Sequence, residues 1–191
     1  MTATVDAAPD GDGETGPATV RVWDPLVRVF HWSLVAAFAT AWATGDEEMS
    51  VHELAGYVIV GLLVFRLAWG IVGSRHARFA DFVYGPAAVI GFLRDSVILR
   101  ARRYVGHNPA GGAMVIALLL TLAVITASGV MMTTDAFWGV RWVRETHETA
   151  VDVALVLVAL HVAGVVLASI EHRENLVKAM ITGRKRAQEA D

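Results

Sequence analysis

Residues 147–161 read HETAVDVALVLVALH, an apolar run closed at both ends by histidine. The run belongs to a longer apolar stretch, about Thr149–Ile170, which is long enough for a helix to cross about 30 Å of hydrocarbon. Because backbone amides in lipid must be satisfied within their own segment, we expect a transmembrane helix here. At about 100° and 1.5 Å per residue, His147 and His161 share one helix face about 21 Å apart.

Three more stretches have the length and apolar character of membrane spans, approximately Leu26–Thr44, Val51–Val72 and Gly112–Met132. The connections Gly45–Ser50 and about Thr133–Thr146 are short, so the helices that they join are antiparallel. The sequence therefore predicts an all-α membrane protein, a four-transmembrane-helix up-and-down bundle.

The amino-acid composition limits which cofactors and partners the chain can bind. Hydrophobic residues make up 55% of the 191 residues and charged residues 18%, below the roughly 25% that soluble domains carry. The net charge of −3 gives no indication of a nucleic-acid partner. The absence of cysteine excludes disulfides, iron–sulfur clusters, thiolate-bound metals and covalently attached haem. Histidine is therefore the strongest metal ligand in the chain.

The remaining segments are polar or amphipathic. Residues 1–20 are rich in Asp, Gly, Ala and Thr and are expected to be a disordered acidic tail. Residues 21–186 are expected to form the membrane domain, and residues 187–191 a short C-terminal tail. Between spans two and three, Pro86–Leu99 mixes apolar residues with Arg94 and Asp95, which is typical of an amphipathic helix lying on the membrane surface.

Cations are concentrated on one side of the predicted bundle. Only Arg141 and Arg144 fall on the other side, near Asp46, Glu47 and Glu48, and Arg66 lies within a span. The remaining Lys and Arg residues are Arg21, Arg28, Arg75, Arg78, Arg94, Arg100, Arg102, Arg103, Arg173, Lys178, Arg184, Lys185 and Arg186. The positive-inside rule places both termini and the long loop, with its amphipathic helix, in the cytoplasm of a bacterial inner membrane.

Four histidines lie inside or at the edge of the spans, where ionisable groups are costly and usually functional. His52 opens the second span at the outer end, at the depth of His147, and His31 in the first span lies at the depth of His161. Two facing imidazoles at each of two depths are what six-coordinate haem iron requires. The spacing therefore predicts two non-covalent haem b groups with these four histidines as axial ligands.

Other interpretations remain open. A zinc or di-iron site would need three or four ligands at one depth. A proton relay along the four histidines would not require pairing by depth. Arg66 shares a face with His52 and lies at the depth of the inner haem, where it could bind a haem propionate or extend towards cytoplasmic headgroups.

Several motifs in order resemble the bacterial cytochrome b561 and nickel–iron hydrogenase b-type cytochrome family, over about residues 22–186. These motifs are WDPLVRVFHW around His31, HELAGY from His52, FRLAWGIVGSRHARF from Phe65, GHNPAGG from Gly106, HETAVDVALVLVALH from His147 and HRENLVKAMITGRKR from His172. The resemblance implies a four-helix di-haem cytochrome whose ligands match the four histidines named above.

The resemblance also implies electron exchange between ubiquinone or menaquinone and a partner redox protein: a hydrogenase, another dehydrogenase or a cytochrome c. Whether the chain acts as an enzyme in its own right, and whether it forms a homodimer, stays open. Two alternatives are a haem-free membrane anchor for a soluble redox enzyme and a stand-alone quinone reductase. The leftover His76, His107 and His172 are expected to lie at the surface or among lipid headgroups.

Overall fold

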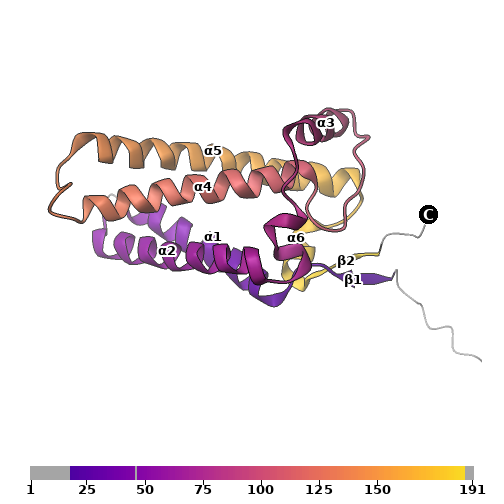
Figure 1. Cartoon of the computed structure of the whole chain (residues 1–191), viewed down its shortest axis with the longest axis horizontal. Helices are drawn as coiled ribbons and strands as arrows, with labels where there is room; N and C mark the ends of the chain where they lie inside the picture. Colours follow the sequence, from indigo (N-terminus) through magenta and orange to yellow (C-terminus); the bar gives the residue numbers. More distant parts are fainter. Residues whose placement is uncertain (1–17, 46, 188–191) are drawn as a thin grey trace, which may run out of the picture.

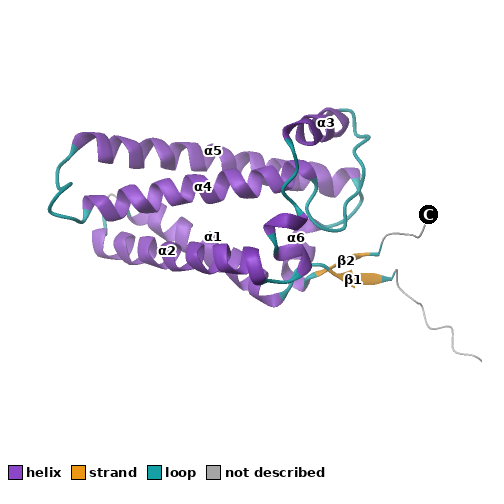
Figure 2. Cartoon of the chain, viewed as in Figure 1, coloured by secondary structure: helices purple, strands orange, loops and turns teal. Residues whose placement is uncertain are grey.

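The computed structural model describes residues 18–45 and 47–187, and that part of the chain is mainly helical (Figures 1 and 2). Four of its helices are long and apolar enough to cross a membrane. They are α1 (Pro25–Thr44), α2 (Met49–Val72), α4 (Pro109–Met132) and α5 (Arg141–Glu171). The prediction of an all-α bundle with four membrane spans is confirmed.

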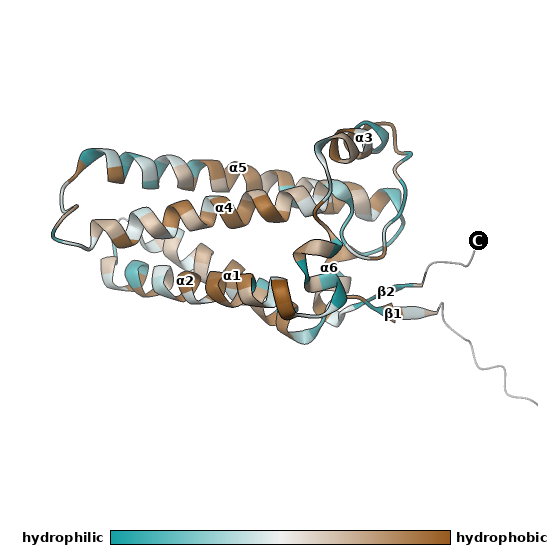
Figure 3. Ribbon diagram, in the orientation of Figure 1, coloured by the Kyte–Doolittle hydropathy of each residue, from teal (hydrophilic) through white to brown (hydrophobic). Residues whose placement is uncertain are grey.

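The bundle is built from two helical hairpins. Helix α1 packs along α2, α4 packs along α5, and α2 joins the hairpins by contacting α4. The buried core is small and includes Ile59 and Leu63 of α2, Leu122 and Ile125 of α4, and Ala154 of α5. Large apolar side chains are exposed over much of the outer surface instead. Figure 3 shows hydrophobic residues along the four long helices. Such an outer surface suits lipid rather than water.

The two ends of the bundle differ in structure. One end, here called the turn end, carries, among the described residues, only the turns between α1 and α2 and between α4 and α5 (Figure 1). The other, here called the basic end, carries α3 (Pro86–Val97), α6 (Leu176–Thr182) and the strand pair β1 (Thr19–Arg21) and β2 (Arg184–Arg186). The thirteen cations assigned to one side of the membrane by the sequence lie at the basic end.

Local sequence explains where the spans begin at the basic end. The carboxylate of Asp24 accepts a hydrogen bond from the Val27 amide at 2.9 Å, and the Asn108 side chain accepts one from the Gly111 amide at 2.7 Å. A proline follows each cap and has no amide hydrogen to leave unsatisfied. Gly112, at the end of the GHNPAGG motif, lies so close to the Phe82 carbonyl that a side chain would clash with it.

The start of the fourth span differs from the prediction. Helix α5 begins at Arg141 rather than near Thr149, so its first turns project beyond the apolar stretch. Ion pairs one turn apart, Arg141–Glu145 at 2.6 Å and Arg144–Glu148 at 3.5 Å, accompany these polar turns. Hydropathy alone missed them because they are charged, although they are helical.

The strand pair at the basic end is a second difference from the prediction. The structure pairs β1 with β2 antiparallel, Thr19 opposite Arg186 and Arg21 opposite Arg184. Thr19 and Val20 therefore belong to an ordered element and not to the predicted acidic tail, the rest of which lies outside the described residues apart from Ala18. Three-residue strands from opposite ends of a chain carry no readable alternation, so no local pattern predicts them.

Candidate cofactor site

The structure brings the four span histidines together in two pairs. His31 of α1 faces His161 of α5, with ring centres 6.5 Å apart, and His52 of α2 faces His147 of α5, with ring centres 6.1 Å apart. The second pair lies towards the turn end and the first towards the basic end. The pairing by depth that the sequence predicts is present in the fold.

The separation of the rings suits a metal ion between two imidazoles. A metal–nitrogen bond is about 2 Å long and the ring centre lies about 1 Å behind its nitrogen, so bis-histidine ligation needs ring centres about 6 Å apart. Both pairs meet this requirement. By contrast, no three His, Cys, Asp or Glu side chains converge within residues 18–45 and 47–187, as a closed zinc or di-iron site would need.

Backbone carbonyls orient the pair near the turn end. His52 Nδ1 lies 2.8 Å from the Ala41 carbonyl oxygen, and His147 Nδ1 lies 2.9 Å from the Ile125 carbonyl oxygen. A carbonyl can only accept, so both Nδ1 atoms are assigned as donors, which leaves each Nε2 with a free lone pair. Metal-binding histidines are commonly held in this way.

Two glycines lie next to the imidazole rings of His52 and His147. A Cβ atom on Gly129 of α4 would lie 3.3 Å from Cε1 of His147, and one on Gly45 would lie 3.4 Å from Nδ1 of His52. The absence of a side chain at Gly129 therefore allows the His147 imidazole to approach α4, whereas a methyl group at Gly45 would only just reach contact with His52.

The pair near the basic end is held differently. Nδ1 of His31 is buried and has no hydrogen-bond partner among the described residues. The His31 ring packs edge-on against Trp32, with centres 5.1 Å apart. The two pairs thus present facing imidazoles in unequal surroundings.

Arg66 is buried at the basic end of α2, with 3% of its surface exposed. Its guanidinium donates to the Ala77 carbonyl at 3.0 Å and lies over the ring of Phe79, 4.8 Å from the centre. The interpretation that Arg66 extends towards headgroups is therefore wrong, because neighbouring loop residues cover it. Contact with a haem propionate stays a prediction.

His107 is partly buried under aromatic side chains, with its Nδ1 atom fully buried, rather than freely exposed at the surface, which corrects the expectation for this residue. Its ring packs between Phe82, with centres 4.5 Å apart, and Trp23, at 4.7 Å. Burial, together with the nearby charges of Arg66 and Lys185, lowers the pKa of His107 to about 3. The ring is therefore neutral at physiological pH. The other leftover histidine of this loop region, His76, pairs with Asp81 at 2.9 Å.

Asp24 links the start of α1 to the end of α2, a contact that the sequence did not reveal. Besides capping α1, its carboxylate accepts hydrogen bonds from Trp69 Nε1 at 3.2 Å and from the Ser74 hydroxyl. Burial alone would raise the pKa of Asp24, but these hydrogen bonds hold it below its ordinary value. The WDP motif near His31 thus fixes the position of the first span.

Comparison with known proteins decides the family. Residues 22–183 match the prokaryotic cytochrome b561 family over most of the chain. The chain belongs to this family. It is therefore a multi-pass membrane cytochrome of the b type, an electron carrier with haem b as its cofactor.

Curated relatives of this b-type cytochrome carry one name, probable Ni/Fe-hydrogenase B-type cytochrome subunit. The Bradyrhizobium diazoefficiens protein is 24% identical, over 96% of this chain and 92% of its own. The Rhizobium leguminosarum bv. viciae protein is 23% identical, over 97% of each chain, and the Cupriavidus necator protein is 27% identical, over 85% of each. No solved structure matches the chain significantly.

Proposed function

We propose that this cytochrome carries two haem b groups and transfers electrons between a nickel–iron hydrogenase and the quinone pool. His31 and His161 would hold one haem, and His52 and His147 the other. The observation that supports this proposal is the presence of two facing histidine pairs at two depths of one bundle, each with the ring separation that bis-histidine ligation needs.

The protein supplies ligands, orientation and an apolar environment. When bound, each haem supplies one-electron redox chemistry, and two of them at different depths would give electrons a path across the bilayer. Two histidines would hold each haem and leave no coordination position of the iron open to a small substrate, which would favour electron transfer. The carbonyls of Ala41 and Ile125 fix the ring planes of His52 and His147.

Arg66 is included as a proposed contact of the haem nearer the basic end. The structure gives its guanidinium one hydrogen bond, to the Ala77 carbonyl, and a guanidinium has five N–H donors. A propionate carboxylate would also offset the cost of a buried cation.

The proposed orientation places the basic end, with both termini, in the cytoplasm of a bacterial inner membrane. Thirteen of the sixteen Lys and Arg residues lie at that end. Only Arg141 and Arg144 lie at the turn end, and each has a glutamate one turn further along α5. This asymmetry is what the positive-inside rule describes.

Hydrogenase is the proposed partner because three relatives that align over nearly their whole length are named as its cytochrome subunits. The proposal is tested in membranes that contain this chain with or without a co-expressed nickel–iron hydrogenase. Hydrogen gas should reduce the b-type absorbance only when the hydrogenase is present, and a short-chain quinone should then reoxidise it.

Other outcomes distinguish the alternatives. A haem-free anchor would show no reduced-minus-oxidised absorbance change at all. Reduction by a dehydrogenase or a cytochrome c, with no response to hydrogen, would replace the proposed partner. Reoxidation by quinone without any protein partner, after reduction by a small reductant, would favour the stand-alone quinone reductase.

A further inference from the structure

A pocket of about 410 Å³ opens at the basic end between the segment that follows α2 and the segment that precedes α4. Its lining residues are Arg75, His76, Arg102, Arg103, Tyr104 and Val105. Three of the six are arginines, so the pocket has the composition of an anion site. It lies apart from the four histidines of the cofactor site.

The positive charge of the pocket is only partly neutralised. Arg75 is 79% exposed and approaches Asp81 only at 3.7 Å, while Asp81 is shared with His76 at 2.9 Å. Arg102 is exposed and has no carboxylate partner among the described residues. Arg75 and Arg102 therefore retain donors for an external anion.

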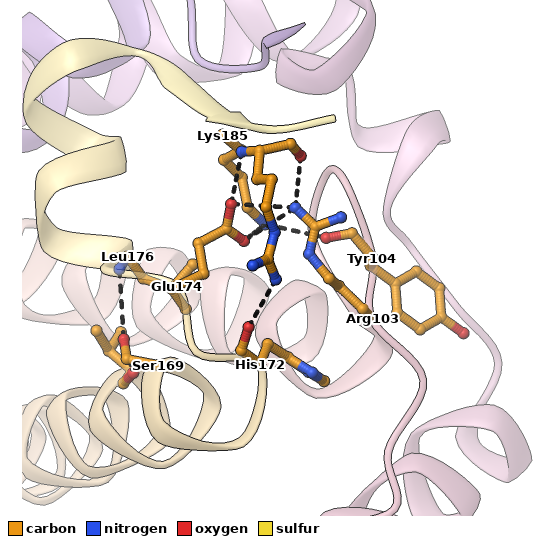
Figure 4. Close-up of polar contacts among 9 residues, drawn as sticks. Arg103, Tyr104, Ser169, His172, Glu174, Leu176 and Lys185 are labelled. Atoms are coloured by element: carbon orange, nitrogen blue, oxygen red, sulfur yellow. Dashed lines mark hydrogen bonds and ion pairs between the residues drawn. The ribbon is translucent and has the colours of Figure 1, made fainter. Parts of the chain in front are cut away.

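The floor of the pocket is fixed by a buried ion cluster (Figure 4). Arg103 donates to Glu174 at 3.0 Å and to the carbonyl of Arg186 at 2.6 Å. Lys185 donates to the Tyr104 carbonyl at 2.9 Å and lies 3.7 Å from Glu174. The loop that bears Arg102 is therefore held against β2, so the pocket is preformed rather than dependent on a mobile loop.

The pocket borders the ends of two membrane spans, where phospholipid phosphates are expected. Arg75 follows the last residue of the α2 span, Val72, by three positions, and Val105 precedes the first residue of the α4 span, Pro109, by four. The adjoining helix α3 exposes Ile90 at 50% and Val97 at 81%. An amphipathic helix with such a face lies among acyl chains next to the headgroups.

We infer that this pocket binds the phosphate of an anionic phospholipid headgroup. Arg75 and Arg102 contact the phosphate oxygens, and the apolar face of α3 contacts the acyl chains. Arginine suits this task because its guanidinium matches two phosphate oxygens at once. A basic pocket beside membrane helices is the expected form of such a site. The inference requires only that the chain spans the membrane, and it goes beyond the proposed electron transfer.

Native mass spectrometry of the full, haem-loaded chain, released from detergent, tests the inference. The probes are phosphatidylglycerol, phosphatidylcholine and inorganic phosphate. The wild-type protein should retain phosphatidylglycerol in preference to phosphatidylcholine. The double variant Arg75→Gln/Arg102→Gln should bind phosphatidylglycerol about tenfold or more weakly, because each arginine near a membrane surface contributes measurably to anionic-lipid binding. Haem content and the absorption spectrum show that the variant is folded.

The matched control is Arg94→Gln/Arg100→Gln, which removes the same charge from exposed positions at the same end but outside the pocket. Equal weakening in this control would overturn the inference in favour of a diffuse electrostatic attraction. Equal retention of phosphatidylcholine would overturn the preference for an anionic headgroup. Displacement of phosphatidylglycerol by inorganic phosphate would identify a free-phosphate site and overturn the lipid assignment.

Discussion

At the scale of single residues, the surroundings of Nδ1 differ among the proposed haem ligands. His52 and His147 each direct Nδ1 at a backbone carbonyl, whereas His31 Nδ1 has no partner among the described residues. A hydrogen bond from Nδ1 raises the basicity of Nε2, which stabilises oxidised iron. The haem that we propose for His52 and His147 is therefore expected to have the lower reduction potential.

The variant Gly129→Ala tests whether the His147 imidazole is a haem ligand. The added methyl would lie 3.3 Å from Cε1 of His147, closer than ordinary contact, so the imidazole must shift by a few tenths of an ångström. We expect one of two low-spin haem signals in electron paramagnetic resonance to move and the other to stay. Gly61→Ala is the control, because nothing lies within 4 Å of its Cβ position. Unchanged signals in Gly129→Ala would contradict the assignment of His147.

We expect His107 to lower the stability of the folded protein at acidic pH. Its pKa falls from 6.5 to about 3 on folding because the ring is buried, so the unfolded chain binds a proton more readily. Below about pH 6.5 this difference progressively favours unfolding. The groups around it act on the same pKa: Arg66, Lys185 and His76 lower it, and Asp81 raises it.

His107→Leu should remove this loss of stability. The thermal midpoint of the variant should fall less than that of the wild-type protein between about pH 7 and pH 5, a range in which most carboxylates stay ionised. Equal decreases of the thermal midpoint in the two proteins would show that His107 is not the titrating group.

At the scale of elements, the basic end is held together by ionic and hydrogen-bonded contacts between segments far apart in the chain. Glu174 follows α5 and joins Arg103, which precedes α4, to Lys185 and the amide of Arg186 in β2 (Figure 4). Burial alone would raise the pKa of Glu174, but these donors hold it below its ordinary value. Its contribution to stability is therefore complete at neutral pH and is lost as the pH falls through the lowered pKa.

Glu174→Gln leaves the partly buried Arg103 and the buried Lys185 without a counter-charge. The side chains of Glu174 and Lys185 are 9% and 6% exposed, so the free energy of unfolding should fall by about 3 kcal/mol. Chemical denaturation in mild detergent measures this change. Glu148→Gln, which removes a 61%-exposed carboxylate from a surface pair, should change it by about 0.5 kcal/mol or less. Equal effects would contradict a stabilising role for the cluster.

The sequence predicts the four spans well, because a helix in lipid needs a long apolar stretch and few other structures satisfy its backbone. It does not predict β1, β2 or α6, which are short elements defined by contacts between chain ends. The depth pairing of His31 with His161 could be predicted because helix rise is regular. The burial of His107 and the burial of Arg66 under loop residues could not be predicted, because both depend on how an irregular loop folds over α2.

At the scale of the whole molecule, the charged residues and the two histidine pairs are arranged along the same axis. The basic end has most of the cations and the pair His31–His161, while the turn end has acidic residues and the pair His52–His147. This polarity gives the protein two distinguishable faces, one on each side of the membrane.

The orientation can be tested by labelling, because the chain has no cysteine of its own. Asp135→Cys at the turn end and Asp95→Cys on α3 place single exposed thiols at opposite ends of the bundle. A membrane-impermeant maleimide should label the first in spheroplasts, and the second only after the membrane is permeabilised. The reverse pattern would contradict the proposed cytoplasmic location of the basic end.

The haem content per chain tests the central claim most directly. A pyridine haemochrome assay on the purified protein should give two haem b groups for the wild type, and one each for the folded variants His147→Ala and His161→Ala. The remaining haem should keep its low-spin spectrum, because the two histidine pairs share no ligand. One haem or none in the wild type, or loss of both from a variant that stays folded, would contradict the account.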